Sequence, residues 1–292
     1  MDGRAVNTRT AALALATAAC GLLLAGCQGS VTVDMASDAP ADTEVSAVRV
    51  EVSGLEFKRS DETTEKLEFT QAEAADLMQL VQVQNSVRLF TAEQVPEGSY
   101  VGVRLLLATD QEASVSRFDG TEYDLNIAEG EFTPIDFTVE EDKSSSESLS
   151  LTLDLRKSLS FDDDANQYTL TPALRSAVTD EAAQVTGSVN VNCPVGTSLA
   201  QGGAVYLYEG EDVEPDDIGS DVEPYATSRV SDDSFSGQLG YSLRFLPAGD
   251  YTIALTCGGD EDEIGVDDDI DFVTTAQIHL DEAEAVTHNF GE

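Results

Sequence analysis

Apolar residues alternate with polar ones along most of the chain, and this period of two constrains the fold more than any other feature. It is clearest in the segments 48–52, 101–107 and 149–155. Such alternation is typical of half-buried β-strands. Gly54 interrupts it and predicts a bulge, while Asp119-Gly120 predicts a hairpin turn. The one helix-like stretch is 71–80, with a turn plus a strand as the alternative. We therefore predict a mainly β chain.

The first 27 residues have the pattern of an export signal. Arg4 and Arg9 precede a predominantly apolar run of 16 residues, 11–26, which is too short to span a bilayer. The sequence Leu24-Ala25-Gly26-Cys27 resembles the bacterial lipobox. The resemblance implies cleavage after residue 26 and alkylation of the Cys27 thiol by diacylglycerol. An ordinary secretory signal with a chance cysteine is the alternative.

The charge of the chain is strongly negative. Its 292 residues contain 15 Lys+Arg and 56 Asp+Glu, a formal charge of −41, which excludes nucleic-acid binding through basic patches. A hydrophobic content of 41% excludes a fully disordered chain. Loss of residues 1–26 removes two Arg and one Asp, which leaves 13 basic and 55 acidic groups, a net of −42. This body would repel anionic lipids, so membrane attachment depends on acyl chains.

Localisation follows from the residue after the modified cysteine. In Gram-negative lipoproteins an Asp there commonly signals retention in the inner membrane, and this chain has Gln28 instead. By that analogy we expect a lipid anchor in the outer membrane, with the side that the protein faces left open.

Two cysteines remain after export and acylation. Cys20 leaves with the signal, and Cys193 and Cys257 end two alternating apolar registers. We therefore expect both sulfurs on core-facing sides of strands, joined in a disulfide that an oxidising envelope would favour. Two reduced, buried cysteines are the alternative.

A short motif occurs twice and indicates two modules. Residues 95–100 (VPEGSY) and 246–251 (LPAGDY) share the pattern apolar-Pro-x-Gly-x-Tyr, in which Pro and Gly suit a tight turn before a strand. We predict two β-sandwich modules after the signal peptide, separated by the polar stretch 179–184. Their predicted ranges are 31–178 and 185–292, preceded by a lipidated cysteine and tether at 27–30.

Five segments in order resemble the bacterial and archaeal domain-of-unknown-function family 4382: VTVDMASDAP, VSAVRVEVSGLEF, VPEGSYVGVRLLL, LTLDLRKSL and YTLTPALRSAV. They cover residues 30 to about 178 and imply a β-rich exported module of unestablished activity. Residues 185–292 look more loosely like a transthyretin-like or carboxypeptidase-regulatory-type β-sandwich, through VTGSV, GGAVYLYEG and FLPAGDYTIALTC. That resemblance implies a spacer or binding module, although the acidic insert before Val273 departs from it.

Each candidate metal site in the sequence also has a simpler structural interpretation. The run 162–167 (DDDANQ) is similar to a calcium loop, but Gln167 stands where such a loop needs Gly, and Ala173 replaces the bidentate acid, so a solvated turn is expected. The acidic runs 260–263 and 267–271 have no ligand spacing and predict a charged loop, with weak divalent-cation contact as the alternative. His279 and His288 are not in metal-ligand spacing either.

The sequence assigns no catalytic, cofactor-binding or metal-binding residue. We expect a lipid-anchored envelope protein with a non-enzymatic binding or structural role, adapted to saline surroundings, whose protein or glycan partner is unidentified. The competing class is an envelope enzyme or cation-dependent adhesin with its site in the acidic loops. Paired carboxylates are the chemistry that an enzyme would draw on.

Because like charges repel, we expect the free energy of unfolding to rise with NaCl up to about 1 M, where the screening length is roughly 3 Å. Denaturant unfolding at a series of NaCl concentrations measures this. CaCl2 at matched ionic strength is the comparison: a calcium-specific gain would favour cation binding over saline adaptation as the reason for the acidic surface.

Overall fold

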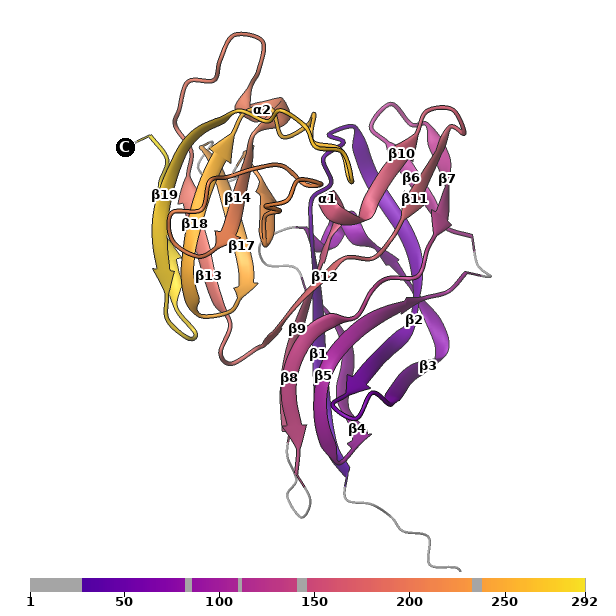
Figure 1. Cartoon of the computed structure of the whole chain (residues 1–292). Helices are drawn as coiled ribbons and strands as arrows, with labels where there is room; N and C mark the ends of the chain where they lie inside the picture. Colours follow the sequence, from indigo (N-terminus) through magenta and orange to yellow (C-terminus); the bar gives the residue numbers. More distant parts are fainter. Residues whose placement is uncertain (1–27, 82–85, 110–111, 141–145, 233–237, 292) are drawn as a thin grey trace, which may run out of the picture.

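The computed structural model describes residues 28–81, 86–109, 112–140, 146–232 and 238–291 (Figure 1). Its regular structure is mainly β-strand, arranged as two sandwich modules that follow one another along the chain. The predicted fold class is confirmed. The first module contains β1 (Gln28–Asp38), β2 (Val45–Arg59), β3 (Thr64–Asp76), η1 (Leu77–Leu80), β4 (Val87–Pro96), β5 (Gly98–Leu107), β6 (Ser114–Arg117), β7 (Glu122–Ile127), β8 (Thr133–Val139), β9 (Ser146–Asp154), α1 (Leu155–Ser158), β10 (Leu159–Asp162), β11 (Gln167–Leu170) and β12 (Leu174–Val178). The second contains β13 (Ala183–Ser188), α2 (Leu199–Gly202), β14 (Ala204–Glu209), β15 (Ala226–Arg229), β16 (Ser231–Asp232), β17 (Leu239–Leu246), β18 (Gly249–Thr256), β19 (Phe272–Leu280) and β20 (Ala285–Thr287).

Two sheets enclose the core of the first module. One has the order β12-β9-β1-β4, and the larger one has the order β10-β11-β7-β6-β2-β5-β8, with β3 paired to β2. The core between them includes Val33 and Leu151 from the first sheet and Phe57 and Tyr100 from the second. Every second residue of β1 from Val31 to Met35 is fully buried, as the period-2 pattern predicts.

Gly54 forms the predicted bulge. The pairing of β2 with both β3 and β5 shifts register between Val52 and Gly54. Gly54 has a φ of +155°, and a Cβ there would lie 2.1 Å from the carbonyl oxygen of Leu67. No side chain fits that close approach, so the bulge requires glycine.

The helix expected over residues 71–80 is not observed. Strand β3 runs to Asp76, and only Leu77–Leu80 turn into a short 3-10 helix. Strand pairing overrides helix propensity here, because residues 73–76 pair with β2. The hairpin expected at Asp119-Gly120 is confirmed, since it joins β6 to β7 and Gly120 has a φ of +86°.

The second module is a smaller sandwich of two four-stranded sheets, with orders β16-β17-β13-β20 and β15-β14-β18-β19. Val185, Leu207, Leu243 and Ile253 lie in the core between them. The modules are joined by residues 179–182, because β12 ends at Val178 and β13 begins at Ala183. This linker lies within the polar stretch 179–184, whose last two residues, Ala183 and Gln184, belong to β13.

The repeated motif makes the same corner in both modules. Each copy carries the chain from one sheet of its sandwich to the other, from β4 to β5 and from β17 to β18. The Tyr100 hydroxyl donates to the carbonyl of Pro96 at 2.7 Å, and the Tyr251 hydroxyl donates to the carbonyl of Pro247 at 2.9 Å. The equivalent geometry explains why Tyr recurs at this position.

The expected tether at residues 27–30 is corrected in part. Residues 28–30 already belong to β1, where they pair with residues 94–96 of β4. Backbone hydrogen bonds to β4 hold them in the sheet, so the fold begins at the residue that follows Cys27. Cys27 itself and the signal peptide 1–26 lie outside the described residues.

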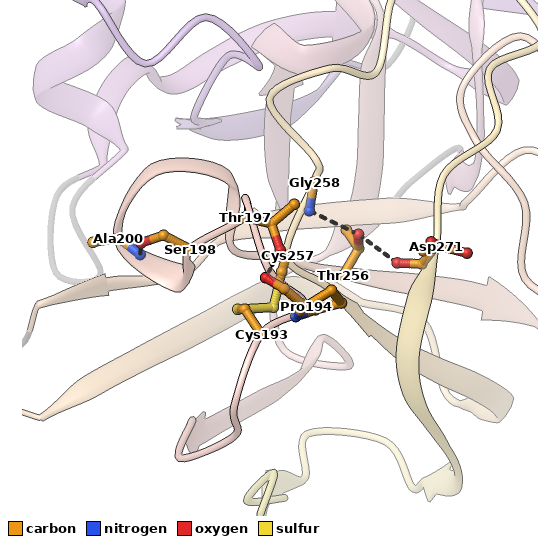
Figure 2. The surroundings of a disulfide bond; sticks show 9 residues. All are labelled: Cys193, Pro194, Thr197, Ser198, Ala200, Thr256, Cys257, Gly258 and Asp271. Atoms are coloured by element: carbon orange, nitrogen blue, oxygen red, sulfur yellow. Dashed lines mark hydrogen bonds between the residues drawn. A yellow bond between two sulfur atoms is a disulfide. The ribbon is translucent and has the colours of Figure 1, made fainter.

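The predicted disulfide between Cys193 and Cys257 is confirmed (Figure 2), with the Cα atoms 5.9 Å apart. The expected strand positions are wrong, because both cysteines lie just beyond strands. Cys257 follows β18 and is buried, whereas Cys193 is half-buried in the loop after β13. Beside the bridge, the Thr256 hydroxyl accepts from the N–H of Gly258 and donates to the carbonyl of Asp271 (Figure 2). These bonds connect the two ends of the loop that joins β18 to β19.

Removing the disulfide should destabilise the second module. The bridge closes a sequence separation of 64 residues, for which the chain-entropy model gives about 4 kcal/mol. We expect the Cys193→Ala/Cys257→Ala variant to lose roughly that free energy of unfolding in urea. Wild-type protein unfolded in a reducing agent is the control and should match the variant. An unchanged unfolding midpoint in both would contradict the prediction.

Candidate functional site

Four arginines lie between the two modules, and each module extends two of them to the other. Residues 28–292 contain nine arginines, so almost half of them lie at this interface. Arg156 and Arg175 belong to the first module, and Arg229 and Arg244 belong to the second. Residues 183–292 have no other Lys or Arg, although they contain 23 acidic residues.

The arginines of the first module are almost completely buried. Arg156 lies in α1, where Asp154 accepts the N–H groups of the first turn as its N-cap. Its guanidinium donates to the carbonyl of Gly259 and lies 3.5 Å from the Tyr206 hydroxyl. The α1 turn therefore directs a cation onto the second module.

Arg175, on β12, is the second of these arginines. It donates to the Asp38 carboxylate within its own module and to the carbonyl of Arg244 in the second module at 3.3 Å. Its guanidinium carbon lies 5.8 Å from the centre of the Tyr225 ring. One guanidinium therefore joins an ion pair, a backbone carbonyl and an aromatic face.

The arginines of the second module donate to backbone carbonyls of the first. Arg229 donates to the carbonyl of Pro40 at 2.8 Å and to the carbonyl of Asp42 at 3.3 Å. Arg244 donates to the carbonyl of Leu80 at 3.1 Å. Burial lowers the pKa of Arg229 to about 10 and also lowers that of Arg244. Both still carry a positive charge at neutral pH.

Asp38 and Asp154 supply buried negative charge at this interface. They end the neighbouring parallel strands β1 and β9, where they are paired in register. Burial raises the pKa of Asp38 to about 6, with the nearby Asp154 charge adding to it and Arg175 working against it. Burial opposes the charge of Arg175 as well, but the two carboxylates outweigh it and raise the pKa of Arg175. The positive charge of Arg175 therefore offsets the repulsion between the adjacent buried carboxylates of Asp38 and Asp154.

A cleft of about 480 Å³, which we call the interface cleft, opens between the modules beside these arginines. From the first module Asp154, Lys157 and Arg175 line it, and from the second Tyr208, Glu209, Val213 and residues 221–225 do so. Across it, Lys157 forms an ion pair with Glu223 at 3.0 Å. The cleft carries both signs of charge, and Tyr208 and Tyr225 form part of its wall.

Five carboxylates gather on two loops of the second module, and we call them the acidic cluster. They are Asp216 and Asp217 from the loop between β14 and β15, and Asp262, Asp267 and Asp268 from the loop between β18 and β19. Oxygens of Asp217, Asp262 and Asp268 lie within 4.8 Å of one another, and so do oxygens of Asp216, Asp217 and Asp267. The sequence flagged the second loop only as a charged run and missed Asp216 and Asp217.

The remaining sequence candidates lie apart from these sites. Residues 163–166 form the turn between β10 and β11, where Asp162 accepts two backbone N–H groups, as expected of a solvated turn. His279 is exposed on β19, and the pKa of its ring is raised by a hydrogen bond to Asp250. Burial lowers the pKa of His288.

Residues 28–172 match the model of a family described as "Domain of unknown function (DUF4382)". The match covers the first module up to residue 172, and we refer to this module as the DUF4382 domain. The match confirms the resemblance expected for residues 30–178. It ends before the second module, whose resemblance to transthyretin-like and carboxypeptidase-regulatory-type sandwiches stays a prediction. A comparison with curated proteins gives no match.

Solved structures give distant likenesses. The TIE protein of Bacillus anthracis is 9% identical with a TM-score of 0.20; the match covers 89% of this chain and 34% of that one, so this chain spans about a third of its length. The minor pilin GBS52 of Streptococcus agalactiae is 13% identical with a TM-score of 0.21, covering 89% of this chain and 94% of that one. A fimbrial protein of Bacteroides ovatus is 8% identical with a TM-score of 0.18, covering 90% and 48%. Scores this low carry no conclusion about fold or function.

Among the described residues of the DUF4382 domain and the second module, no helix has the length and apolar character needed to cross a bilayer.

Loss of the Arg175 guanidinium should destabilise the interface. In an Arg175→Leu variant, Asp38 of the DUF4382 domain stays buried near Asp154 without its cation, and we expect a loss of about 3–5 kcal/mol in the free energy of unfolding in urea. The Asp38→Asn/Arg175→Leu double variant should recover much of it, because the stranded charge is gone.

Arg88→Leu is the matched control, since Arg88 pairs with Asp34 in the same sheet but at the surface. Exposed pairs contribute little, so its stability should stay close to wild type. An Arg175→Leu variant as stable as Arg88→Leu would contradict the role given to the buried pair.

Proposed function

We propose that this protein is a lipid-anchored component of the cell envelope, held in the outer membrane by acyl chains on Cys27, with a non-enzymatic structural or binding role. The lipobox-like sequence before Cys27 supports the anchor. The net negative charge of the mature chain also supports a lipid anchor, because anionic lipids would otherwise repel the protein. Adaptation to saline surroundings belongs to the same proposal for the carboxylates outside the acidic cluster, since salt would screen them.

The observation that carries the proposal is the course of β1. This strand begins at Gln28, directly after the cysteine, and ends at Asp38, the partner of Arg175 at the module interface. Its 11 residues span about 35 Å at roughly 3.3 Å per residue. It starts at the end of the first module remote from the second (Figure 1). A lipid on residue 27 would therefore place the first module at the membrane and the second away from it.

Three of the five buried acidic groups in the described part of the chain serve the fold, which supports a structural role. Asp38 pairs with Arg175, Asp154 caps α1, and Glu56 accepts from Arg104 at 2.6 Å. A binding role would use the interface cleft, because a ligand there would contact both modules.

The anchor is tested by Cys27→Ser, followed by membrane fractionation and mass measurement of the mature chain. We expect wild-type protein in the membrane fraction, with an N-terminal Cys27 that carries the mass of its acyl chains. The Cys27→Ser variant should leave the membrane fraction, because the acylated thiol is absent. Cys20→Ser is the control and should behave as wild type, since Cys20 is removed with the signal. A Cys27→Ser variant that stays with membranes would overturn the proposal.

A further inference from the structure

The acidic cluster lies over the outer face of a sheet, away from the main core of the second module. On β14, Val205 and Leu207 face that core, whereas Tyr206 and Tyr208 point to the opposite side. There the loops 210–225 and 257–271 cover them, and both tyrosines are fully buried. The cluster therefore lies between two loops and the sheet, with Asp217 and Asp262 buried and Asp267 exposed.

Most oxygens of its two most buried carboxylates have partners. Asp262 accepts from the N–H of Ile218 at 3.1 Å and from the Tyr206 hydroxyl. Asp217 is completely buried, and its Oδ2 accepts from the N–H of Asp268 at 2.8 Å. Its Oδ1 is buried without a hydrogen-bond partner among the described residues. Asp217 also belongs to both groups of converging carboxylates, so negative charge accumulates around its side chain.

Cationic side chains are scarce around this cluster. Arg229 and Arg244, the basic residues of the second module, donate to backbone carbonyls of the first module. Arg156 contacts Gly259 and Tyr206. Carboxylates this close in a buried place need a counter-charge or a proton.

We propose that the acidic cluster is a calcium site in which Asp217, Asp262 and Asp268 are the inner ligands and Asp216 and Asp267 complete the oxygen shell. A hard divalent cation would satisfy the buried Asp217 oxygen and offset the repulsion between the carboxylates. Ca²⁺ takes six to eight oxygens in flexible geometry, which suits five carboxylates on two irregular loops. Mg²⁺ demands octahedral geometry, retains several waters and usually uses one or two carboxylates.

The ion would also support the module interface. The Tyr206 hydroxyl, which donates to Asp262, lies beside Arg156, and Arg156 donates to Gly259 in the same loop. Calcium that orders loop 257–271 would therefore hold the carbonyl that the first module binds. This inference does not depend on the lipid anchor.

The test uses the full chain, stripped with EDTA and kept in detergent. Thermal unfolding is followed with CaCl2, MgCl2 or NaCl at equal ionic strength. Saturating Ca²⁺ should raise the melting temperature by about 5 °C or more, because a ligand that binds only the folded state stabilises it. MgCl2 and NaCl should act alike and give a smaller rise. Equal effects of all three salts would overturn the proposal.

Terbium luminescence measures binding directly. The chain has no Trp, so excitation reaches bound Tb³⁺ through tyrosine, and Tyr206 and Tyr208 lie beneath the cluster. We expect sensitised emission that Ca²⁺ displaces and that Mg²⁺ at the same concentration leaves in place. Absence of emission, or equal displacement by both ions, would count against a calcium site.

The decisive variant is Asp217→Asn, with Asp269→Asn as its matched control. Asp269 is an exposed acid of the same loop outside the cluster. Asp217→Asn should abolish both the calcium-dependent shift and the terbium signal, and without calcium its melting temperature should equal or exceed that of wild type because repulsion is relieved. Asp269→Asn should retain both responses. If Asp217→Asn fails to fold, Asp268→Asn takes its place, since Asp268 is only half-buried. Retention of both responses in the cluster variant that folds would overturn the proposal.

Discussion

The buried pair of Asp38 and Arg175 is the contact on which the two-module arrangement depends. Asp38 reaches the interface because β1 is held in register by β9 along one edge and β4 along the other. Arg175 faces it from β12, the next strand beyond β9. The same guanidinium then donates to the backbone of β17 in the second module. The register of three strands in one sheet thus decides where the neighbouring module is bound.

The few basic residues of the second module are used at the interface between the modules. The second module has two basic residues in all, and both donate to carbonyls of the first module. Carbonyl acceptors carry no net charge, so these arginines keep their cationic character inside the interface, where Asp38 and Asp154 lie nearby. The Lys, Arg, Asp and Glu side chains of the second module outside this interface are therefore all acidic. Burial of guanidinium groups requires acceptors for most of their donors, and the exchanged hydrogen bonds supply several, although the Nε atoms of Arg156 and Arg175 have no partner among the described residues.

Local rules predicted the strands, the Gly54 bulge and the Asp119-Gly120 hairpin, because each depends on neighbouring residues. The pairing of Cys193 with Cys257 was predictable because only these two cysteines remain after export and acylation. The helix over 71–80 was wrong because partner strands decide the outcome of a short amphipathic run. The acidic cluster escaped prediction because Asp217 and Asp262 are 45 positions apart and meet only when two loops fold over the same face of a sheet. For the interface arginines, the sequence shows only that Arg229 and Arg244 are two basic residues in a long acidic segment. It does not indicate which surface their side chains face.

Strand β1 runs from Gln28, the first described residue, to Asp38 at the interface with the second module. It is hydrogen-bonded along both edges, parallel to β9 and antiparallel to β4. Tension between the start of β1 and the second module acts along the strand, so it loads the two ladders in shear, and many bonds must fail together rather than one after another. A fold with this geometry resists pulling along that direction far better than peeling from an edge.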